Sequence, residues 1–508
     1  MDDSGTTLSV AGQAVVEERQ LLKSLRWYDG FVIALCNPGF LIGSLGFVLA
    51  SVGVLGAIGL WGVSAAIGLM QVFIYSETAA MFPDKAGGIS LYAFEGWRRY
   101  FSVFGPIAAF GYWIGWAVVL SIFGNLIGSL VAAQWFPSAP MGGTTPGYFS
   151  TGFVNVGLPQ LIGIGVIIGI WAINEFGVKL TMGVGYVTGV LLMIPLAVFI
   201  VVPYFTGDWH ASNLTYVSVP GHSNFSVWMV WLFIMCWSAY GVEVCASFAP
   251  EYHNTKRDTA LALRSSAVFC LAVFTLLPLG LGGVVGATGD SGAFYVAAFG
   301  TLVGHSLGGV ALVLLIASLV LSMNSATADA GRALYGISQE GMTIKQLGVL
   351  NRHHVPGRGM TVNMVLNVGL ILFVANNLAI LYLSNIGYVF CHVLALSGFL
   401  LLRKDRPDWP RPIKLHSIWL LVAGACLVAD AAMLVFGLMD QDLVALLGGY
   451  QHSGGPFILG IGILVLSVVL FFYRRAVQDK MPITLRDRDC PIMPTEAQLA
   501  LLQAEMAE

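Results

Sequence analysis

The chain has 508 residues, of which 57% are hydrophobic and only 10% are charged, and its mean hydropathy is +0.80. A soluble protein carries roughly a quarter charged residues, so this composition indicates a polytopic membrane protein. The formal net charge of −3 excludes a protein that binds nucleic acid through a basic surface, and we expect no nucleic-acid partner.

Apolar runs of about 20 residues recur along the whole chain, which is the length that a helix needs to cross the hydrocarbon of a bilayer. We therefore predict about twelve transmembrane helices in contact with membrane lipid. They lie near residues 30–49, 55–80, 104–133, 158–173, 182–204, 225–249, 265–286, 307–325, 360–379, 383–402, 417–438 and 456–473.

The basic residues divide cleanly between the predicted loops. All 24 Lys and Arg residues either precede the first helix or follow an even-numbered helix, including Lys179 after the fourth. The opposite loops, such as residues 136–157 and 206–224, contain none. Because basic loops stay on the cytoplasmic side, we expect both termini in the cytoplasm and the protein in the plasma (inner) membrane.

The predicted helices group into two halves of similar length. Residues 25–204 and 225–402 would each hold five helices, and because five is odd the second half must be inverted relative to the first. Residues 415–475 would add helices eleven and twelve, between cytoplasmic tails at residues 1–24 and 476–508. The expected fold is an all-α polytopic membrane protein with a five-plus-five inverted repeat and two extra C-terminal helices.

Each half opens with a helix that the sequence interrupts. Proline lacks a backbone donor and glycine tolerates unusual dihedral angles, so the first helix should break near Pro38 and the sixth near Gly241. Interrupted helices at matching places in inverted halves point to a substrate site at the membrane midplane. The predicted substrate-binding residues are Asn37, Pro38, Gly39, Phe40, Trp113, Trp237, Ser238, Ala239, Tyr240 and Gly241. The structural alternative for Trp113 and Trp237 is that they only pack against lipid or a neighbouring helix.

Glu243 lies two residues beyond Gly241, inside the predicted sixth helix. A carboxylate at that depth is costly unless it faces a cavity or a partner. Since the segment contains no basic residue, burial favours the protonated form and a role in gating or proton coupling. The alternative is structural, with the carboxylate only accepting hydrogen bonds from backbone groups that the break sets free.

Four motifs occur in order on the predicted cytoplasmic side. They are Glu77, Pro83, Gly87-Gly88 and Tyr92 after the second helix; Gly241-Val242-Glu243 in the sixth; Arg332-Ala333-Leu334-Tyr335 with Gln339-Glu340-Gly341 after the eighth; and Arg411-Pro412-Ile413-Lys414 after the tenth. With these motifs the chain resembles the amino acid–polyamine–organocation superfamily over nearly all of residues 25–473. The resemblance implies the five-plus-five fold and alternating-access transport of amino acids or related amines and polyamines.

Two departures from that pattern bear on function. Family members often carry a glycine-rich break in the first helix, whereas this chain has Asn37-Pro38-Gly39-Phe40, which puts recognition of an α-amino carboxylate in doubt. Some members carry a lysine in the fifth helix in place of a sodium ion, and residues 182–204 have none. Lysine-based proton coupling is therefore in doubt as well.

Other polar residues of the spans have structural interpretations. Asp329 lies one turn before Arg332, which favours a local ion pair over an amine site. His392 is expected to be a hydrogen-bonded core residue, and Glu77 an anchor of the cytoplasmic loop. Asp430 lies outside the repeat and has no functional interpretation. The seven cysteines form no paired pattern, so we predict free thiols and no metal site.

These features favour a secondary transporter of an amino acid or organic amine, working as a uniporter, proton symporter or exchanger. No nucleotide-binding or catalytic motif is present, so we expect no enzyme activity and no cofactor, and a gradient would supply the driving force. The main alternative is a membrane sensor that keeps the transporter fold and binds such a ligand without net flux. A membrane-embedded enzyme is a third alternative, and it lacks a polar cluster for chemistry.

Overall fold

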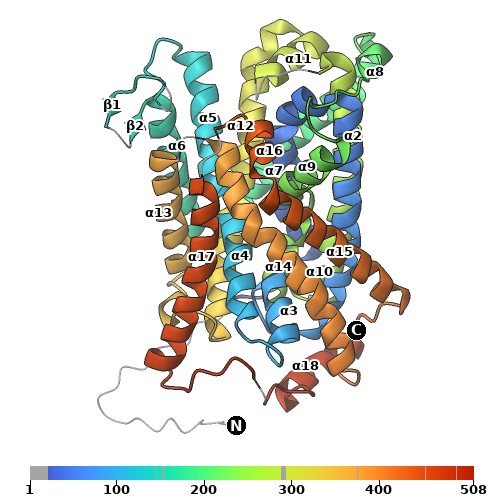
Figure 1. The fold of residues 1–508 in the computed structure, drawn as a ribbon, viewed down its shortest axis with the longest axis vertical. Helices are drawn as coiled ribbons and strands as arrows, with labels where there is room; N and C mark the ends of the chain where they lie inside the picture. Colours follow the sequence, from blue (N-terminus) through green and yellow to red (C-terminus); the bar gives the residue numbers. More distant parts are fainter. Residues whose placement is uncertain are drawn as a thin grey trace, which may run out of the picture.

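The structure is a computed structural model that describes residues 21–142, 145–151, 154–287, 293–374, 376–451, 454–487 and 489–507. Most of the predicted N-terminal tail, residues 1–20, lies outside the described residues. Long helices run roughly along one axis of the molecule (Figure 1). The short helix α18 lies at one end of this axis, and the hairpin of β1 and β2 and the helix α11 lie at the other (Figure 1).

Helices account for nearly all of the regular structure in the described residues. The predicted first half contains α1 (Trp27–Ala34), α2 (Cys36–Met81), α3 (Gly88–Trp97), α4 (Phe104–Ala117), α5 (Val119–Trp135), α6 (Leu158–Glu175), α7 (Val178–Val201) and α8 (Pro203–Thr206). The predicted second half contains α9 (Asn224–Ala239), α10 (Thr255–Val285), α11 (Ala293–Val303), α12 (Gly308–Gln339), α13 (Gly357–Phe373) and α14 (Asn377–Asp405). The remaining α-helices are α15 (Ile418–Met439), α16 (Gln441–Leu447), α17 (Gly454–Tyr473) and α18 (Glu496–Ala507).

Shorter elements complete the fold. The 3-10 helices are η1 (Ala211–Asn213), η2 (Gly241–Glu251), η3 (His305–Leu307) and η4 (Lys345–Leu347), and η5 (Arg474–Gln478) is a π-helix. The strands β1 (Phe149–Ser150) and β2 (Asn155–Val156) pair antiparallel, with Phe149 opposite Val156.

The helices confirm the prediction of an all-α polytopic membrane protein. Among the described residues, ten helical segments are long and apolar enough to cross a membrane. The first and second predicted helices are joined in α2, which kinks at Gly53, where φ is 72°. The ninth predicted helix is α13, which at 17 residues is shorter than the others. All twelve predicted spans therefore fall on apolar helices of the structure.

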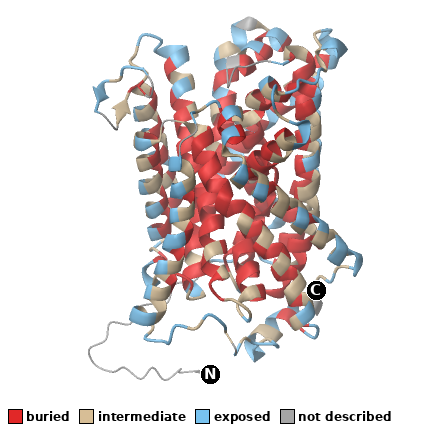
Figure 2. Ribbon diagram, viewed as in Figure 1, coloured by how far each residue is buried: buried red, intermediate tan, exposed pale blue. Residues whose placement is uncertain are grey.

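Burial separates an inner group of helices from an outer group (Figure 2). In the segment Asn224–Glu251, 83% of an apolar stretch of 18 residues is buried, compared with 17% of such a stretch in Gly454–Gln478. Because an outer helix with an exposed apolar face is stable only against lipid, α6, α15 and α17 form a rim around the inner helices. The relation of the two halves by inversion, and the domain boundaries, stay predictions.

Candidate functional site

The first interruption lies at Leu35, between α1 and α2. Asn37, Pro38 and Gly39 therefore form the first turn of α2. Proline is tolerated there because the first amides of a helix have no carbonyl partner within that helix. Gly39 faces α12, since a Cβ atom at this position would lie 2.9 Å from the carbonyl oxygen of Ser318. Gly39 therefore serves close contact between two helices, and no lining role for it is seen.

The second interruption lies where the sequence predicts it. The α-helix α9 ends at Ala239, and η2 continues from Gly241 as a 3-10 helix of 11 residues. Runs of 3-10 helix longer than three or four residues are uncommon, and such a stretch often marks a hinge. Gly241 is in close contact with the first break, because a Cβ atom here would lie 2.2 Å from Oδ1 of Asn37. The two interrupted helices therefore meet at Asn37 and Gly241.

Glu243 lies two residues beyond Gly241 in η2 and is fully buried. Its Oε1 accepts hydrogen bonds from Nε1 of Trp116 at 3.2 Å and from the hydroxyl of Tyr388 at 2.5 Å. Its other oxygen, Oε2, has no hydrogen-bond partner in the described part of the chain. Both donors are neutral, so the site does not compensate a negative charge on Glu243 with a cation.

An aromatic stack lies against Trp116, which donates to Glu243. Trp237 stacks on Phe40 with ring centroids 4.5 Å apart and planes 13° from parallel, and its Nε1 donates to the carbonyl oxygen of Gly115 at 3.0 Å. Phe40 in turn contacts Trp116, the donor to Glu243, at 5.7 Å between ring centroids. Trp237 also lines a cavity of about 70 Å³. Ring contacts therefore run from this cavity through Trp237 and Phe40 to Trp116, which donates to Glu243.

The prediction that Asp329 pairs with Arg332 is wrong. Arg332 instead forms a buried ion pair with Glu251 at the end of η2. Asp329 accepts hydrogen bonds from the hydroxyls of Tyr112, at 3.1 Å, and Ser247, and its Oδ2 has no partner among the described residues. The reason lies in helix geometry: the Arg332 side chain is directed to η2, where Glu251 offers both oxygens to the planar guanidinium. Asp329 is therefore a second buried carboxyl, and its donor Tyr112 contacts Tyr388, the donor to Glu243, at 6.4 Å between ring centroids.

The Glu251–Arg332 pair lies at the end of η2, and Trp237 lies before η2 on the other side of Glu243 along the chain. The guanidinium of Arg332 lies over the ring of Phe248 at 4.3 Å from its centroid. The backbone amides of Ser24 and Leu25 both donate to the carbonyl oxygen of Glu251 at 2.9 Å, which ties the start of the chain to the end of η2. Beyond this layer lies a cavity of about 590 Å³, lined in part by Pro250 and Leu501.

The structure brings together some of the predicted site residues and not others. Asn37 meets Gly241, two residues before Glu243, and Phe40 and Trp237 are linked to Glu243 through Trp116. Ser238 donates to the carbonyl of Met235 and lines a small cavity beside Trp237, and Ala239 contacts α2 at Gly68 through its carbonyl oxygen. Trp113 contacts Phe110 at 5.5 Å between ring centroids, and no observed contact joins it to Glu243.

Sequence reasoning missed Trp116, Tyr112 and Tyr388 as partners of the two carboxyls. A signal for two of them was present, because Tyr112 and Trp116 are four residues apart and so share one face of a helix. Trp113 points to a different face. Tyr388 belongs to α14 and could be assigned only once the contact between α4 and α14 was known.

Two further predictions concern His392 and Glu77. Nδ1 of His392 shares a hydrogen bond with Tyr75 at 2.9 Å, whereas its Nε2 has no partner among the described residues. The expectation of a hydrogen-bonded core histidine is thus met at one nitrogen. Glu77 anchors the loop as predicted, accepting from Arg403 at 2.6 Å and from the amide of Leu415 at 2.8 Å.

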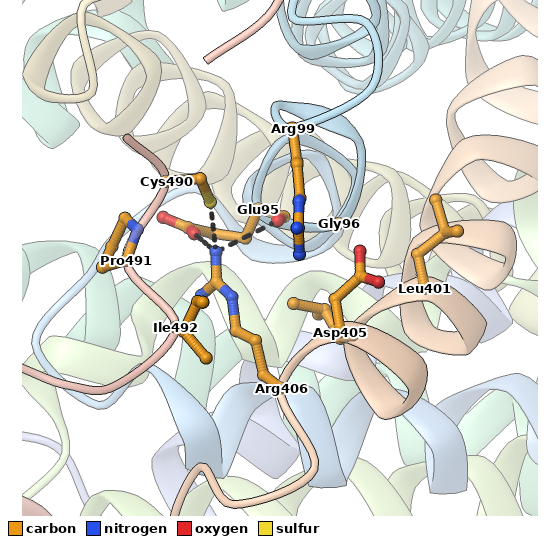
Figure 3. A pocket seen from close by; sticks show the side chains of 10 residues that line it. Glu95, Gly96, Arg99, Leu401, Asp405, Arg406, Cys490, Pro491 and Ile492 are labelled. Atoms are coloured by element: carbon orange, nitrogen blue, oxygen red, sulfur yellow. Dashed lines mark hydrogen bonds and ion pairs between the residues drawn. The ribbon is translucent and has the colours of Figure 1, made fainter. Parts of the chain in front are cut away.

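A charged network surrounds Glu95 of α3, outside the membrane-spanning segments. Lys85, Arg98 and Arg406 form ion pairs with Glu95 at 2.8, 3.2 and 2.7 Å. Burial alone would raise the pKa of Glu95, but these three cations lower it to about 2. Figure 3 shows the Arg406 guanidinium between Glu95 and the thiol of Cys490, which lies 3.0 Å away. The network therefore joins α3, α14 and the C-terminal segment.

The comparison with protein families agrees with this architecture. The amino acid permease family matches residues 25–482, a region that contains both interrupted helices and both buried carboxyls. A comparison with curated proteins found no match. Because the family match spans most of the chain, the protein belongs to the amino acid permease family of the amino acid–polyamine–organocation superfamily, whose members transport amino acids or related compounds.

Proposed function

We propose that this permease carries a small molecule with a protonated amino group by alternating access, and that the group binds at Glu243. The observation that carries the proposal is a set of buried acceptors without donors. Oε2 of Glu243, Oδ1 of Asn37 and Oδ2 of Asp329 all lack hydrogen-bond partners in the described part of the chain. A buried acceptor left unpaired is costly, so these atoms favour a ligand that supplies N–H donors.

Charge supports the same class of ligand. No ion pair joins Glu243 or Asp329 to a Lys or Arg side chain among the described residues. A substrate ammonium would provide the missing cation, and protons would do so in its absence. Amino acids and simple amines both carry this group, and a carboxylate on the substrate would be bound by amides at the start of α2.

Two closed layers support alternating access. On one side of Glu243 along the chain, Trp237 stacks on Phe40 and borders the cavity of about 70 Å³; on the other side, the Glu251–Arg332 pair follows Pro250, which borders the cavity of about 590 Å³. Gly241 and the 3-10 helix after it lie between these layers. Opening one layer while the other stays closed would expose Glu243 to one side at a time, which is the requirement for coupled transport.

Uptake by the purified protein in liposomes tests this function. We expect radiolabelled amino acids or amines to accumulate in proteoliposomes and not in protein-free liposomes, and an imposed pH gradient to change the rate if Glu243 exchanges protons. The substrate analogue in which the amino group is replaced by a hydroxyl should not be carried, because it has no charge to pair with Glu243. Equal uptake of both compounds would contradict the assigned role of the ammonium. Saturable binding without flux would instead support a sensor.

A further inference from the structure

Asp430 is a third carboxyl in the membrane-spanning part of the molecule. It lies in the middle of α15, which the sequence places outside the repeated halves, and its side chain is fully buried. Ionisable residues at this depth are expensive and are retained mostly for a function. The proposed transport mechanism makes no use of Asp430.

Its two oxygens bind the hinge and the second span. Oδ1 accepts a hydrogen bond from the hydroxyl of Tyr240 at 2.9 Å, and Oδ2 accepts one from Nε2 of Gln71 at 2.8 Å. Tyr240 is the residue directly between the end of α9 and the start of η2 at Gly241. Asp430 therefore holds the position at which the sixth helix changes its geometry.

No ion pair joins Asp430 to a Lys, Arg or His side chain among the residues that the structure describes. The helices packed against α15 are α2, α9, α14 and α16. The titratable groups near the carboxyl are Tyr75 from α2, Cys236 from α9 and Tyr240 directly after α9. His392 of α14 approaches through its contact with Tyr240, and Cys426 belongs to α15 itself. Asp440 and Asp442 of the α16 region lie beyond the end of α15. Tyrosine and cysteine in such places are uncharged, so only the neutral donors offset an ionised Asp430.

A chain of buried aromatic groups connects Asp430 to Glu243. Tyr388, which donates to Glu243, contacts the ring of His392 at 4.8 Å between centroids. The same imidazole contacts the ring of Tyr240 at 5.1 Å, and Tyr240 donates to Asp430. The two carboxyls are thus the ends of one continuous set of contacts through three side chains.

The surroundings can accommodate Asp430 with or without a proton. Oε1 of Gln71 is buried and has no hydrogen-bond partner among the described residues. If Asp430 gains a proton at Oδ2, a half-turn of the Gln71 amide brings Oε1 to accept it. Tyr240 then donates to a neutral carbonyl oxygen, which is a weaker acceptor than a carboxylate. The hydrogen bond that holds the hinge therefore weakens when Asp430 is protonated.

We propose that Asp430 is a second proton-binding carboxyl of this permease and a positioning residue for the sixth-helix hinge, acting through its hydrogen bond to Tyr240. The ionised form holds Tyr240 firmly, and uptake of one proton from bulk water at Oδ2 loosens it and lets the segment at Gly241 move. The proton returns to bulk water when the carboxylate re-forms. This role rests on the transport function proposed above.

The test compares the pH dependence of uptake in four proteins reconstituted into liposomes. The pH profile of the parent should show two inflections, one for Glu243 and one for Asp430. Each proton-linked step changes the uptake rate by up to about tenfold per pH unit. Asp430→Asn should lose one inflection and Glu243→Gln the other. Asp440→Asn, at the end of the same helix, should match the parent, because asparagine caps a helix as well as aspartate. An Asp430→Asn profile that overlays the parent's would overturn the proposal and leave the transport function intact.

A second readout does not depend on transport. Infrared difference spectra of the parent across a pH titration should contain a protonated-carboxyl band that is absent from Asp430→Asn. Tyr240→Phe, which keeps the acid and removes the bond, should retain this band while its uptake loses the corresponding inflection. This variant keeps the proposal testable if Asp430→Asn does not fold.

The outcomes separate the two proposals. If the parent carries no substrate but the carboxyl band titrates, the transport function fails and proton binding at Asp430 stands. If the band does not depend on Asp430, the proposal for Asp430 is rejected.

Discussion

Glu95 and Glu243 are both enclosed carboxyls, but their surroundings are opposite. Glu95 contacts three cations, whereas the side-chain hydrogen bonds of Glu243 in the described part of the chain come only from the neutral donors Trp116 and Tyr388. A buried carboxylate compensated by cations is held in one charge state, while one that has only neutral donors can change its state when a ligand or proton arrives. The difference in partners therefore separates a structural acid from a site at which charge can change.

The pKa of Glu95 leads to a prediction about acid stability. Its folded pKa of about 2 lies below the ordinary value of 4.5, so its contribution to stability is present above pH 4.5 and is lost as the pH falls toward 2. We expect Glu95→Gln to lower the free energy of unfolding at neutral pH by about 3 kcal/mol, because three cations lose their buried partner. Thermal unfolding in detergent at a series of pH values measures both effects.

The matched control is Glu340→Gln, which removes a single ion pair to Lys85 from a more exposed position. Its cost should be well below that of Glu95→Gln, since partly exposed pairs contribute little. Equal melting temperatures for the parent and Glu95→Gln at neutral pH would show that the Glu95 network does not stabilise the fold.

At the scale of elements, the contact between α4 and α14 determines the shape of the site. A Cβ atom at Gly387 would lie 2.6 Å from Cα of Gly111, so the two helices approach backbone to backbone. Small residues permit this approach in membranes. Tyr388 follows Gly387 directly, and the close approach brings its hydroxyl to the same oxygen of Glu243 that Trp116 of α4 contacts.

Gly387→Ala should therefore separate α4 from α14 and weaken substrate binding together with stability. The added methyl group would meet backbone that cannot rotate away, which costs on the order of 1–3 kcal/mol. The control is Gly169→Ala in α6, where a Cβ atom meets nothing within 4 Å and alanine is the better helix former. Thermal unfolding with and without substrate measures both quantities, and a Gly387→Ala protein as stable as Gly169→Ala would contradict the packing argument.

At the scale of the whole molecule, the positions of the charged residues indicate how the protein is oriented in the membrane. The ion pairs of Glu77, Glu95 and Arg332 all involve loops or helix ends that the sequence assigns to the cytoplasm. The hairpin of β1 and β2 lies at the opposite end of the long axis from α18 (Figure 1). Because basic residues are retained on the cytoplasmic side, the end that carries α18 should face the cytoplasm.

Cysteine labelling tests this orientation. Ser138 and Lys345 are both exposed and belong to opposite sets of loops. In a Cys490→Ser background, where the six remaining cysteines are buried, Ser138→Cys should react with an impermeant maleimide added to intact cells. Lys345→Cys should react only after the membrane is permeabilised. Labelling of Lys345→Cys in intact cells would reverse the proposed orientation.

The properties that depend on local composition could be predicted from the amino-acid sequence. The positions of the spans, the one-sided distribution of Lys and Arg, the break at Gly241 and the depth of Glu243 follow from hydropathy, charge and backbone preference along one segment. The first break was predicted within a few residues of Leu35, because proline restricts where a helix can begin.

Which side chains meet became known from the packing of the helices. Arg332 pairs with Glu251 although Asp329 is nearer in sequence, and Tyr388 and Trp116 converge on Glu243 from different helices. Asp430 acquires a partner in Tyr240, 190 residues away. Hydropathy fixes how deep a residue lies in the membrane, but not how each helix is rotated about its axis or which neighbour it packs against. Those two variables are set by close contacts between helices, such as that of Gly111 with Gly387, and they determine the chemistry of the site.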